Sequence, residues 1–229
     1  ALKGKWDLTT TASIAVVITL FMTSRSFLFN WRQSAIDAEK LQKENIAAKY
    51  ESLKNQVNPH FLFNSFNALS NLVYEDPDKA VKFIKQLSEV YRYVLETRDR
   101  EVVSLQEELH FLQSYIYLQK IRFGEKLDID ITLSDTTSNI PPLALQILVE
   151  NAIKHNIVSE EDPLFVKIYS DDGYLVVENN LQKKNQPHEP SPGVGLENIC
   201  KRYEFLGNKK VGIVEGPDRF LVKLPLLSA

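Results

Sequence analysis

The sequence is poor in thiols: it has a single cysteine, Cys200, among 229 residues. One thiol can form neither an internal disulfide nor a metal site built on several cysteines, so we expect a reducing compartment and a buried, apolar role for Cys200. An excess of positive charge is also missing, because the formal net charge is −3 and the pI is about 5.9. Direct binding to nucleic acid needs a basic patch that neutralises phosphates, so no direct nucleic-acid contact is expected.

Charged residues are also absent from one apolar stretch near the start of the sequence, residues 9–24. With the residues that follow, it reaches roughly 20 residues, the length that spans a bilayer. Trp6 and Trp31 bracket it as interfacial aromatic residues would. We favour a last transmembrane helix over residues 1–30; the alternative is the buried start of a long soluble helix. The first residue, Ala1, suggests a fragment or a processed piece of a longer protein.

Glycine and proline are absent from residues 31–57, which are rich in helix formers. The apolar residues in this range have imperfect heptad spacing, which favours a helical coiled-coil linker; a solvated single helix is the alternative. Pro59 should then kink or restart the helix, because proline has no backbone N–H.

Two stripes of residues follow Pro59 with the same 4-3-4 spacing. The apolar stripe comprises Leu62, Phe66, Leu69 and Val73, and the polar stripe comprises His60, Asn64, Asn67 and Asn71. At about 3.6 residues per turn, the two stripes are displaced by about half a turn. We therefore expect His60 to point outward, with Asn64 one turn further along the helix.

A second amphipathic helix is predicted after Asp76, which is a good N-cap, and Pro77, which suits the first helical position. Residues 58–102 then form an antiparallel helical hairpin. Two such hairpins can pair into a four-helix bundle, so we expect a homodimer.

The pattern changes in residues 103–229. Ser104 and Glu107 form the sequence of a capping box, alternating apolar residues at 127–133 predict a half-buried strand, and Asp172-Gly173 predicts a hairpin turn. The expected fold class is α+β and multidomain: a long membrane-proximal helix, a dimeric helical hairpin and an α/β sandwich domain with helices on one face of a mixed or antiparallel sheet.

Two segments of this second half carry groups suited to phosphate chemistry. Gly193 and Gly195 would let an anion approach the N-terminus of a helix, although a tight turn is the plainer explanation. Earlier, Asn151 could hold a hydrated divalent cation, and Lys154 or His155 could contact phosphates. Alone, this second segment could be an ordinary polar helix face.

Together, the segments resemble the LytS-type sensor histidine kinases, whose catalytic domain belongs to the gyrase, chaperone and kinase ATPase superfamily. Asn58-Pro59-His60-Phe61-Leu62-Phe63-Asn64 resembles the phosphoacceptor motif of that family, Glu150 to His155 its N-box, and Gly193 to Ile199 its second glycine box. The resemblance covers roughly residues 31–226. It implies ATP as the nucleotide, bound by Asn151, Lys154, His155, Gly193, Gly195 and Leu196, with Mg²⁺ held by Asn151.

The sequence departs from the family pattern in two places. Where the family carries an aspartate that contacts the adenine amino group, the best match is Asn179, with Glu178 as the alternative. Many histidine kinases have an acidic residue directly after the phosphoacceptor, and here that residue is Phe61. Activation of His60 would therefore come from Asn64 or from Glu150.

The resemblance implies that the neutral imidazole of His60 attacks the γ-phosphoryl group of Mg-ATP, and that the phosphoryl group passes to an aspartate on a response regulator. The family suggests a regulator with a LytTR-type DNA-binding domain. It also implies a homodimer in the cell inner membrane, anchored through the N-terminal helix, with its kinase core in the cytoplasm.

Two other functions remain open at this stage. The altered residue at position 179 and the missing acidic neighbour would suit a non-catalytic dimeric signalling scaffold with a degenerate nucleotide site. A superfamily ATPase that drives a conformational cycle is the other possibility, although it would have no use for His60.

Overall fold

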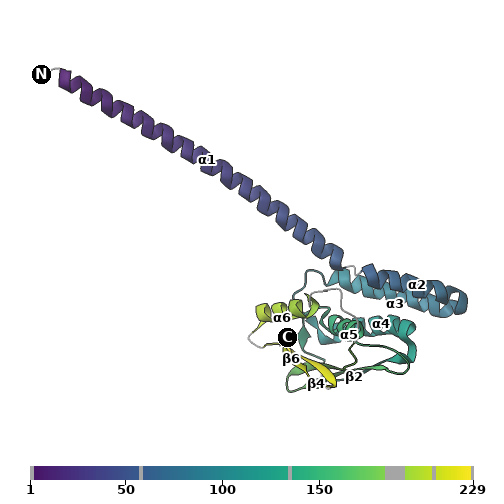
Figure 1. Ribbon diagram of the computed structural model, residues 1–229. Coiled ribbons are helices and arrows are strands. Elements are labelled where there is room, and N and C mark those ends of the chain that lie inside the picture. Colours follow the sequence, from purple (N-terminus) through teal and green to yellow (C-terminus); the bar gives the residue numbers. More distant parts are fainter. Residues whose placement is uncertain (1–2, 57–58, 134–135, 184–193, 208–209, 228–229) are drawn as a thin grey trace. The chain divides into compact units, whose positions relative to one another are not determined.

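The computed structural model describes residues 3–56, 59–133, 136–183, 194–207 and 210–227 (Figure 1). The chain divides into two units, Ala1–Asn58 and Pro59–Ala229.

The first unit is one helix, α1 (Lys3–Gln56). Its segment Thr9–Ser34 is long and apolar enough to cross a membrane, and its apolar side chains are exposed. Within this segment the hydroxyls of Thr19 and Thr23 donate to the carbonyls of Ala15 and Thr19, at 2.8 and 2.9 Å. These polar groups are thus satisfied inside the helix, as a lipid environment requires.

The second unit starts with a helical hairpin made of α2 (Pro59–Glu75) and α3 (Pro77–Glu96). Asp76 is the N-cap of α3, and its side chain accepts from the backbone N–H of Lys79 at 3.0 Å. This hydrogen bond lowers the pKa of the Asp76 carboxyl. Both the restart of the helix at Pro59 and the cap at Asp76 are confirmed.

The packed face of α2 differs from the apolar stripe that the spacing indicates. Ser65 and Leu72 are buried, whereas Phe66 and Val73 are about half exposed. The reason is that α2 packs on α4 as well as on α3, with the ring of Phe61 centred 5.4 Å from that of Tyr115. Two residues of the expected stripe, Phe66 and Val73, are therefore left exposed in the single chain, while Leu69 packs against the core.

The remaining elements form the α/β part of the unit. They are β1 (Val103–Ser104), α4 (Leu105–Phe123), the 3-10 helix η1 (Gly124–Lys126), β2 (Leu127–Thr132), β3 (Asn139–Ile140), α5 (Ala144–His155), β4 (Leu164–Asp171), β5 (Tyr174–Asn180), α6 (Val194–Leu206), β6 (Gly212–Glu215) and β7 (Arg219–Pro225).

The main sheet has the strand order β2-β4-β5-β7-β6. β2 and β4 are parallel and the other neighbours are antiparallel, so the sheet is mixed. On β4, Leu164, Val166 and Ile168 are buried, whereas Phe165 and Lys167 between them are exposed. This alternation puts one face of the sheet on the core beneath α5 (Figure 1), as expected for helices on one face. A second, two-stranded sheet pairs β1 with β3.

The turn between β4 and β5 confirms the predicted hairpin. Asp172 and Gly173 both have positive φ, 44° and 76°. Positive φ at both central residues defines the type I′ turn, which matches the twist of the flanking strands.

Helix α4 is buried on two sides because it lies between the hairpin and the sheet. Leu105 and Leu112 are fully buried, and so is Tyr115 on another side of the helix. Phe111 stacks on Tyr93 of α3 with ring centroids 4.2 Å apart. The hairpin and the sheet therefore share one hydrophobic core through α4.

Candidate active site

His60 lies in the first turn of α2 and is exposed, as the spacing predicts. The amide nitrogen of Asn64 lies 3.1 Å from its Nε2 atom and 3.4 Å from its Nδ1 atom. The side chain of Asn64 therefore lies against the imidazole ring of His60, one turn further along the helix. The expected pairing of His60 with Asn64 is confirmed.

A cavity of about 480 Å³ opens between the C-terminal half of α5 and the strands β5 and β7. Its lining includes four of the residues expected to bind nucleotide: Asn151, His155, Asn179 and Leu196. Segments far apart in the sequence supply them, namely α5, the end of β5 and the first turn of α6. The cavity is also lined by Leu181, Lys183, Glu215, Phe220, Ala152 and Asn156.

Gly195 matters for how closely α6 approaches α5. A Cβ atom at this position would lie 3.0 Å from Cγ2 of Ile147 and 3.8 Å from Oδ1 of Asn151. A Cβ contact of 3.0 Å is tighter than nine in ten real ones, so any side chain here would force Ile147 to give way by a few tenths of an ångström. Glycine thus holds the start of α6 against the helix that carries Asn151.

Asn179 and Glu178 are adjacent on β5 but face opposite sides of the sheet. Asn179 is buried at the cavity, and its amide nitrogen donates to the carbonyl of Asn180 at 2.6 Å. Glu178 accepts from the hydroxyl of Tyr169 at 3.0 Å and pairs with Arg219. Of the two alternatives for the adenine contact, only Asn179 lines the described cavity.

Six residues of the cavity lining were not predicted from the sequence, and three of them, Lys183, Glu215 and Phe220, come from outside the predicted motifs. Phe220 lies on β7 directly opposite Asn179, and Lys183 pairs with Glu215 at 2.5 Å. Strand register brings Phe220 to the site, and register is set by pairing between segments about 40 residues apart, which local patterns do not contain. If the pairing of β5 with β7 had been known, the position of Asn179 would have identified Phe220 as its cross-strand neighbour.

Not every expected site residue lines the cavity. Lys154 is exposed and Glu150 is half-buried, and neither is among the described lining residues. His60 is also absent from that lining, and Gly193 lies outside the residues that the structure describes. In the described part of the chain, no cluster of three or more histidine, cysteine, aspartate or glutamate residues could hold a metal ion. A divalent cation here would depend on Asn151 and on oxygens of a bound phosphate.

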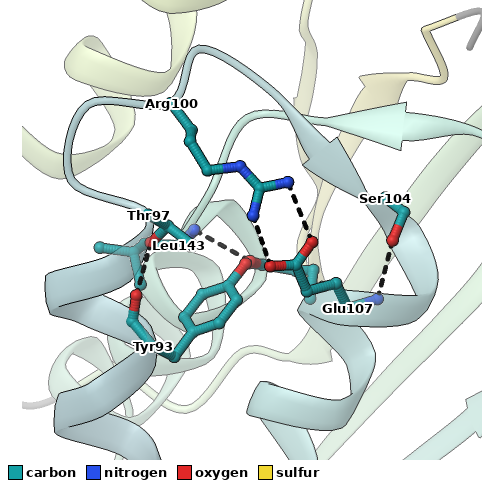
Figure 2. A network of polar contacts seen from close by, with 7 residues as sticks. Tyr93, Thr97, Arg100, Ser104, Glu107 and Leu143 are labelled. Carbon is teal, nitrogen blue, oxygen red and sulfur yellow. Dashed lines mark hydrogen bonds and ion pairs between the residues drawn. The ribbon is translucent and has the colours of Figure 1, made fainter.

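A buried carboxylate, Glu108 of α4, lies where α3, α4 and α5 meet. Its Oε2 atom accepts from the hydroxyl of Tyr93 at 2.5 Å and from the backbone N–H of Leu143 at 3.0 Å, and its Oε1 atom accepts from the N–H of Leu145 at 3.1 Å. Figure 2 shows two of these donors, Tyr93 and Leu143, beside the Arg100–Glu107 ion pair. Burial raises the pKa of Glu108 to about 7, against its three hydrogen bonds, and it raises the pKa of the Tyr93 hydroxyl.

Comparison with known proteins identifies the class. Residues 48–127 match the family described as histidine kinase. The sensor histidine kinase YpdA of Escherichia coli is 39% identical over 182 residues, which are 74% of this chain and 32% of that protein. The chain is therefore a member of the histidine kinase family.

Within that family, the relatives define a narrower group. The sensor protein LytS of Staphylococcus saprophyticus is 34% identical over 176 residues, 69% of this chain and 30% of that protein, and the LytS of Bacillus subtilis is 33% identical over 194 residues, 77% and 33%. The chain belongs to the LytS-type sensor histidine kinases. It spans about a third of the length of these curated relatives.

Solved structures match more weakly. The catalytic domain of histidine kinase ThkA aligns with a TM-score of 0.38 at 18% identity, covering 56% of this chain and 97% of that one. The cytoplasmic segment of histidine kinase QseC aligns with a TM-score of 0.38 at 15% identity, covering 65% and 94%. The family assignment rests on the sequence matches.

Proposed function

We propose that this chain is the kinase core of a two-component sensor that phosphorylates its own His60 from Mg-ATP and passes the phosphoryl group to an aspartate of a response regulator. The observation that carries the proposal is the pair of sites in one unit: an exposed histidine in contact with an amide, and a separate cavity lined by Asn151 and Asn179. Membership of the histidine kinase family supports it.

ATP fits the cavity by the chemistry of its lining. With its amide nitrogen committed to Asn180, the carboxamide oxygen of Asn179 is left to accept from the amino group of adenine. Phe220 offers an aromatic surface to the base. Asn151 and His155 lie on α5, where Asn151 would supply one oxygen to Mg²⁺ while phosphate oxygens and water supply the others. Mg²⁺ would neutralise the negative charge of the phosphates.

Gly195 and Leu196 would bring the N-terminal turn of α6 to the phosphates, since free N–H groups at a helix start bind anions. Gly193 and Lys154 belong to the same proposal as phosphate contacts. Glu150 remains a candidate for activating His60, next to Asn64.

The phosphoryl step itself needs positioning more than covalent chemistry from the protein. A bond forms between a ring nitrogen of His60 and the γ-phosphorus while the bond to the bridging oxygen breaks and ADP leaves. Asn64 would hold the ring in one orientation before the step. Since His60 is not among the described residues of the cavity lining, the γ-phosphoryl group must reach it by movement of the chain or from a second copy.

A homodimer through the hairpin is part of the proposal. Apolar residues of α2 and α3 are at least about half exposed in the single chain, and a four-helix bundle would cover them: Phe63, Phe66, Val73, Val81 and Ile84. The domain limits that accompany it are residues 1–30, 31–57, 58–102 and 103–229.

The proposed location is the cell inner membrane, with Thr9–Ser34 as the spanning helix and the kinase core in the cytoplasm. The proposed partner is a response regulator with a LytTR-type DNA-binding domain, so that the kinase itself makes no contact with nucleic acid.

The test is labelling of the full chain in detergent micelles with ATP that carries radioactive phosphorus in the γ position. We expect an acid-labile label in the wild type, as a phosphohistidine gives, and no label in His60→Gln. The matched control is His110→Gln, because His110 is exposed on α4, outside the described cavity lining. No label in the wild type, or equal label in His60→Gln, contradicts the kinase function. The non-catalytic signalling scaffold or the conformational ATPase would then be the better explanation.

A further inference from the structure

Glu108 is fully buried, yet its carboxylate is held by groups from two other helices. Tyr93 of α3 donates to it from the hairpin, and the backbone N–H groups of Leu143 and Leu145 donate from the start of α5. Buried carboxylates are costly unless they are hydrogen-bonded, so this arrangement fixes the three helices relative to one another. The hairpin that bears His60 and the helix that bears Asn151 meet at one side chain.

The start of α5 depends on this contact, because the local sequence provides no cap. Leu143 occupies the N-cap position without a side-chain hydrogen bond, and the first turn has no acidic residue. The backbone of Leu143 is left-handed, with φ at 65°, a conformation that residues other than glycine rarely adopt. The side chain of Glu108 takes over the role of the cap, because its two oxygens accept from the N–H groups of Leu143 and Leu145.

Helix α6 also contacts the segment directly before α5. Arg202 donates from Nη1 to the carbonyl of Pro142 at 3.0 Å, directly before Leu143. The next residue, Tyr203, is fully buried; burial raises the pKa of its hydroxyl, and the charge of Glu108 adds to this rise. Since α6 also carries Leu196 of the cavity lining, α6 links that part of the lining to the segment directly before α5 through Arg202.

We propose that Glu108 is a positioning residue that couples the His60 hairpin to the nucleotide helix, through Tyr93 on one side and the backbone of Leu143 and Leu145 on the other. Asn151 lies about two turns after the start of α5, so a shift of α3 reaches it through a rigid helix. This inference rests on the proposed function for its catalytic consequence, but the coupling itself is a property of the chain without nucleotide.

Two variants separate the two sides of the contact. Tyr93→Phe removes only the hydroxyl and leaves the ring stacked on Phe111, so it cuts the link from the hairpin while Glu108 still caps α5. Glu108→Gln keeps the shape of the side chain but replaces one accepting oxygen by a donor, so it disturbs both sides. Glu107→Gln is the matched control: it makes the same change one residue earlier, in an exposed pair with Arg100.

The first measurement is amide hydrogen exchange of the full chain in detergent, without nucleotide. Coupling predicts that Tyr93→Phe speeds exchange at Leu143 and Leu145 by about fivefold to tenfold, since one ordinary buried hydrogen bond corresponds to about that factor. Glu107→Gln should leave these two amides at the wild-type rate. Unchanged exchange in Tyr93→Phe overturns the coupling.

The second measurement separates nucleotide binding from phosphoryl transfer in folded protein. In Tyr93→Phe we expect the Kd for Mg-ADP to stay within about twofold while the rate of His60 labelling falls about tenfold; in Glu108→Gln both should worsen. A purely structural role would lower the melting temperature without this split. Equal labelling rates in Tyr93→Phe and the wild type also overturn the coupling.

The two proposals fail in different ways. If the wild type never labels His60, the kinase function fails, and the exchange rates of Leu143 and Leu145 alone decide the coupling. If the wild type labels His60 and Tyr93→Phe changes neither exchange nor rate, the kinase function stands and the coupling fails.

Discussion

The two helices to which we assign the proposed chemistry are held in opposite ways. α2 presents His60 in an exposed first turn, where its described polar contact is Asn64 of the same helix. α5 starts at a buried carboxylate that comes from another helix and carries Asn151 into a cavity. A phosphoacceptor must be reached by a donor and later by a partner, whereas a nucleotide must be held in one geometry. Local restraint on α2 and long-range restraint on α5 match these two needs.

The largest expected effect is on stability, and it comes from the titration of the buried Glu108 at the start of α5. Burial raises the pKa of Glu108 from about 4.5 to about 7, so the folded protein holds a proton that the unfolded chain releases. The contribution of Glu108 to stability is therefore constant below about pH 4.5 and falls as pH rises towards about 7, by a few kcal/mol in all.

Glu108→Gln should lose this fall, because an amide does not titrate. Urea unfolding at pH 5 and pH 8 measures the free energy of unfolding at both ends of the window. The carboxylate of Glu107 and the hydroxyl of Tyr203 also act electrostatically with Glu108, so Glu107→Gln is run beside it. A slope in Glu108→Gln as steep as in the wild type would assign the pH dependence to another group.

The next largest effect should be on nucleotide binding, through Asn151 in the cavity. Asn151→Ala removes the amide that would meet Mg²⁺ and phosphate, and we expect Mg-ADP to bind roughly tenfold to a hundredfold more weakly, because a hydrogen bond to a charged group is worth about 1.5–3 kcal/mol. Asn151 is half-buried and α5 is capped at its far end, so the melting temperature should barely change. Isothermal titration with Mg-ADP measures the Kd, and Lys167→Ala, on the exposed face of β4, is the control. Wild-type affinity in Asn151→Ala would place the nucleotide elsewhere.

The smallest expected effect concerns Asn64, which contacts the exposed His60 on α2. Asn64→Ala should slow His60 labelling by about tenfold, the value of one oriented hydrogen bond, with Mg-ADP affinity unchanged. The adjacent polar residue Asn67, exposed on the same helix, serves as the control through Asn67→Ala. If both variants label at the wild-type rate, Asn64 does not orient His60 and another residue must.

Much of the fold could be predicted from local signals. The cap at Asp76, the turn at Asp172-Gly173 and the restart at Pro59 depend on residues within a few positions of one another, and all three are confirmed. The pairing of His60 with Asn64 belongs to the same kind, since helical geometry alone places them together.

Other features depend on partners that a local pattern does not contain. Phe220 reaches the cavity through the register of β5 with β7, and Glu108 reaches α5 across 35 residues of sequence. Glu107 shows how one contact replaces another: the N–H of Glu107 donates to Ser104 as the capping box predicts, but its carboxylate pairs with Arg100. The packed face of α2 is likewise set by α4, which lies more than 30 residues further along the chain.

The position of Glu108 also bears on how the second unit folds. Its carboxylate can be buried at low cost only after α5 has formed and offered its N–H groups, and α5 needs the same carboxylate to begin at Leu143. Neither the helical hairpin with α4 nor the sheet with α5 can complete its core first. The residues from Pro59 onward should therefore gain their native structure in one cooperative transition, with the contact between Glu108 and α5 among the last to form.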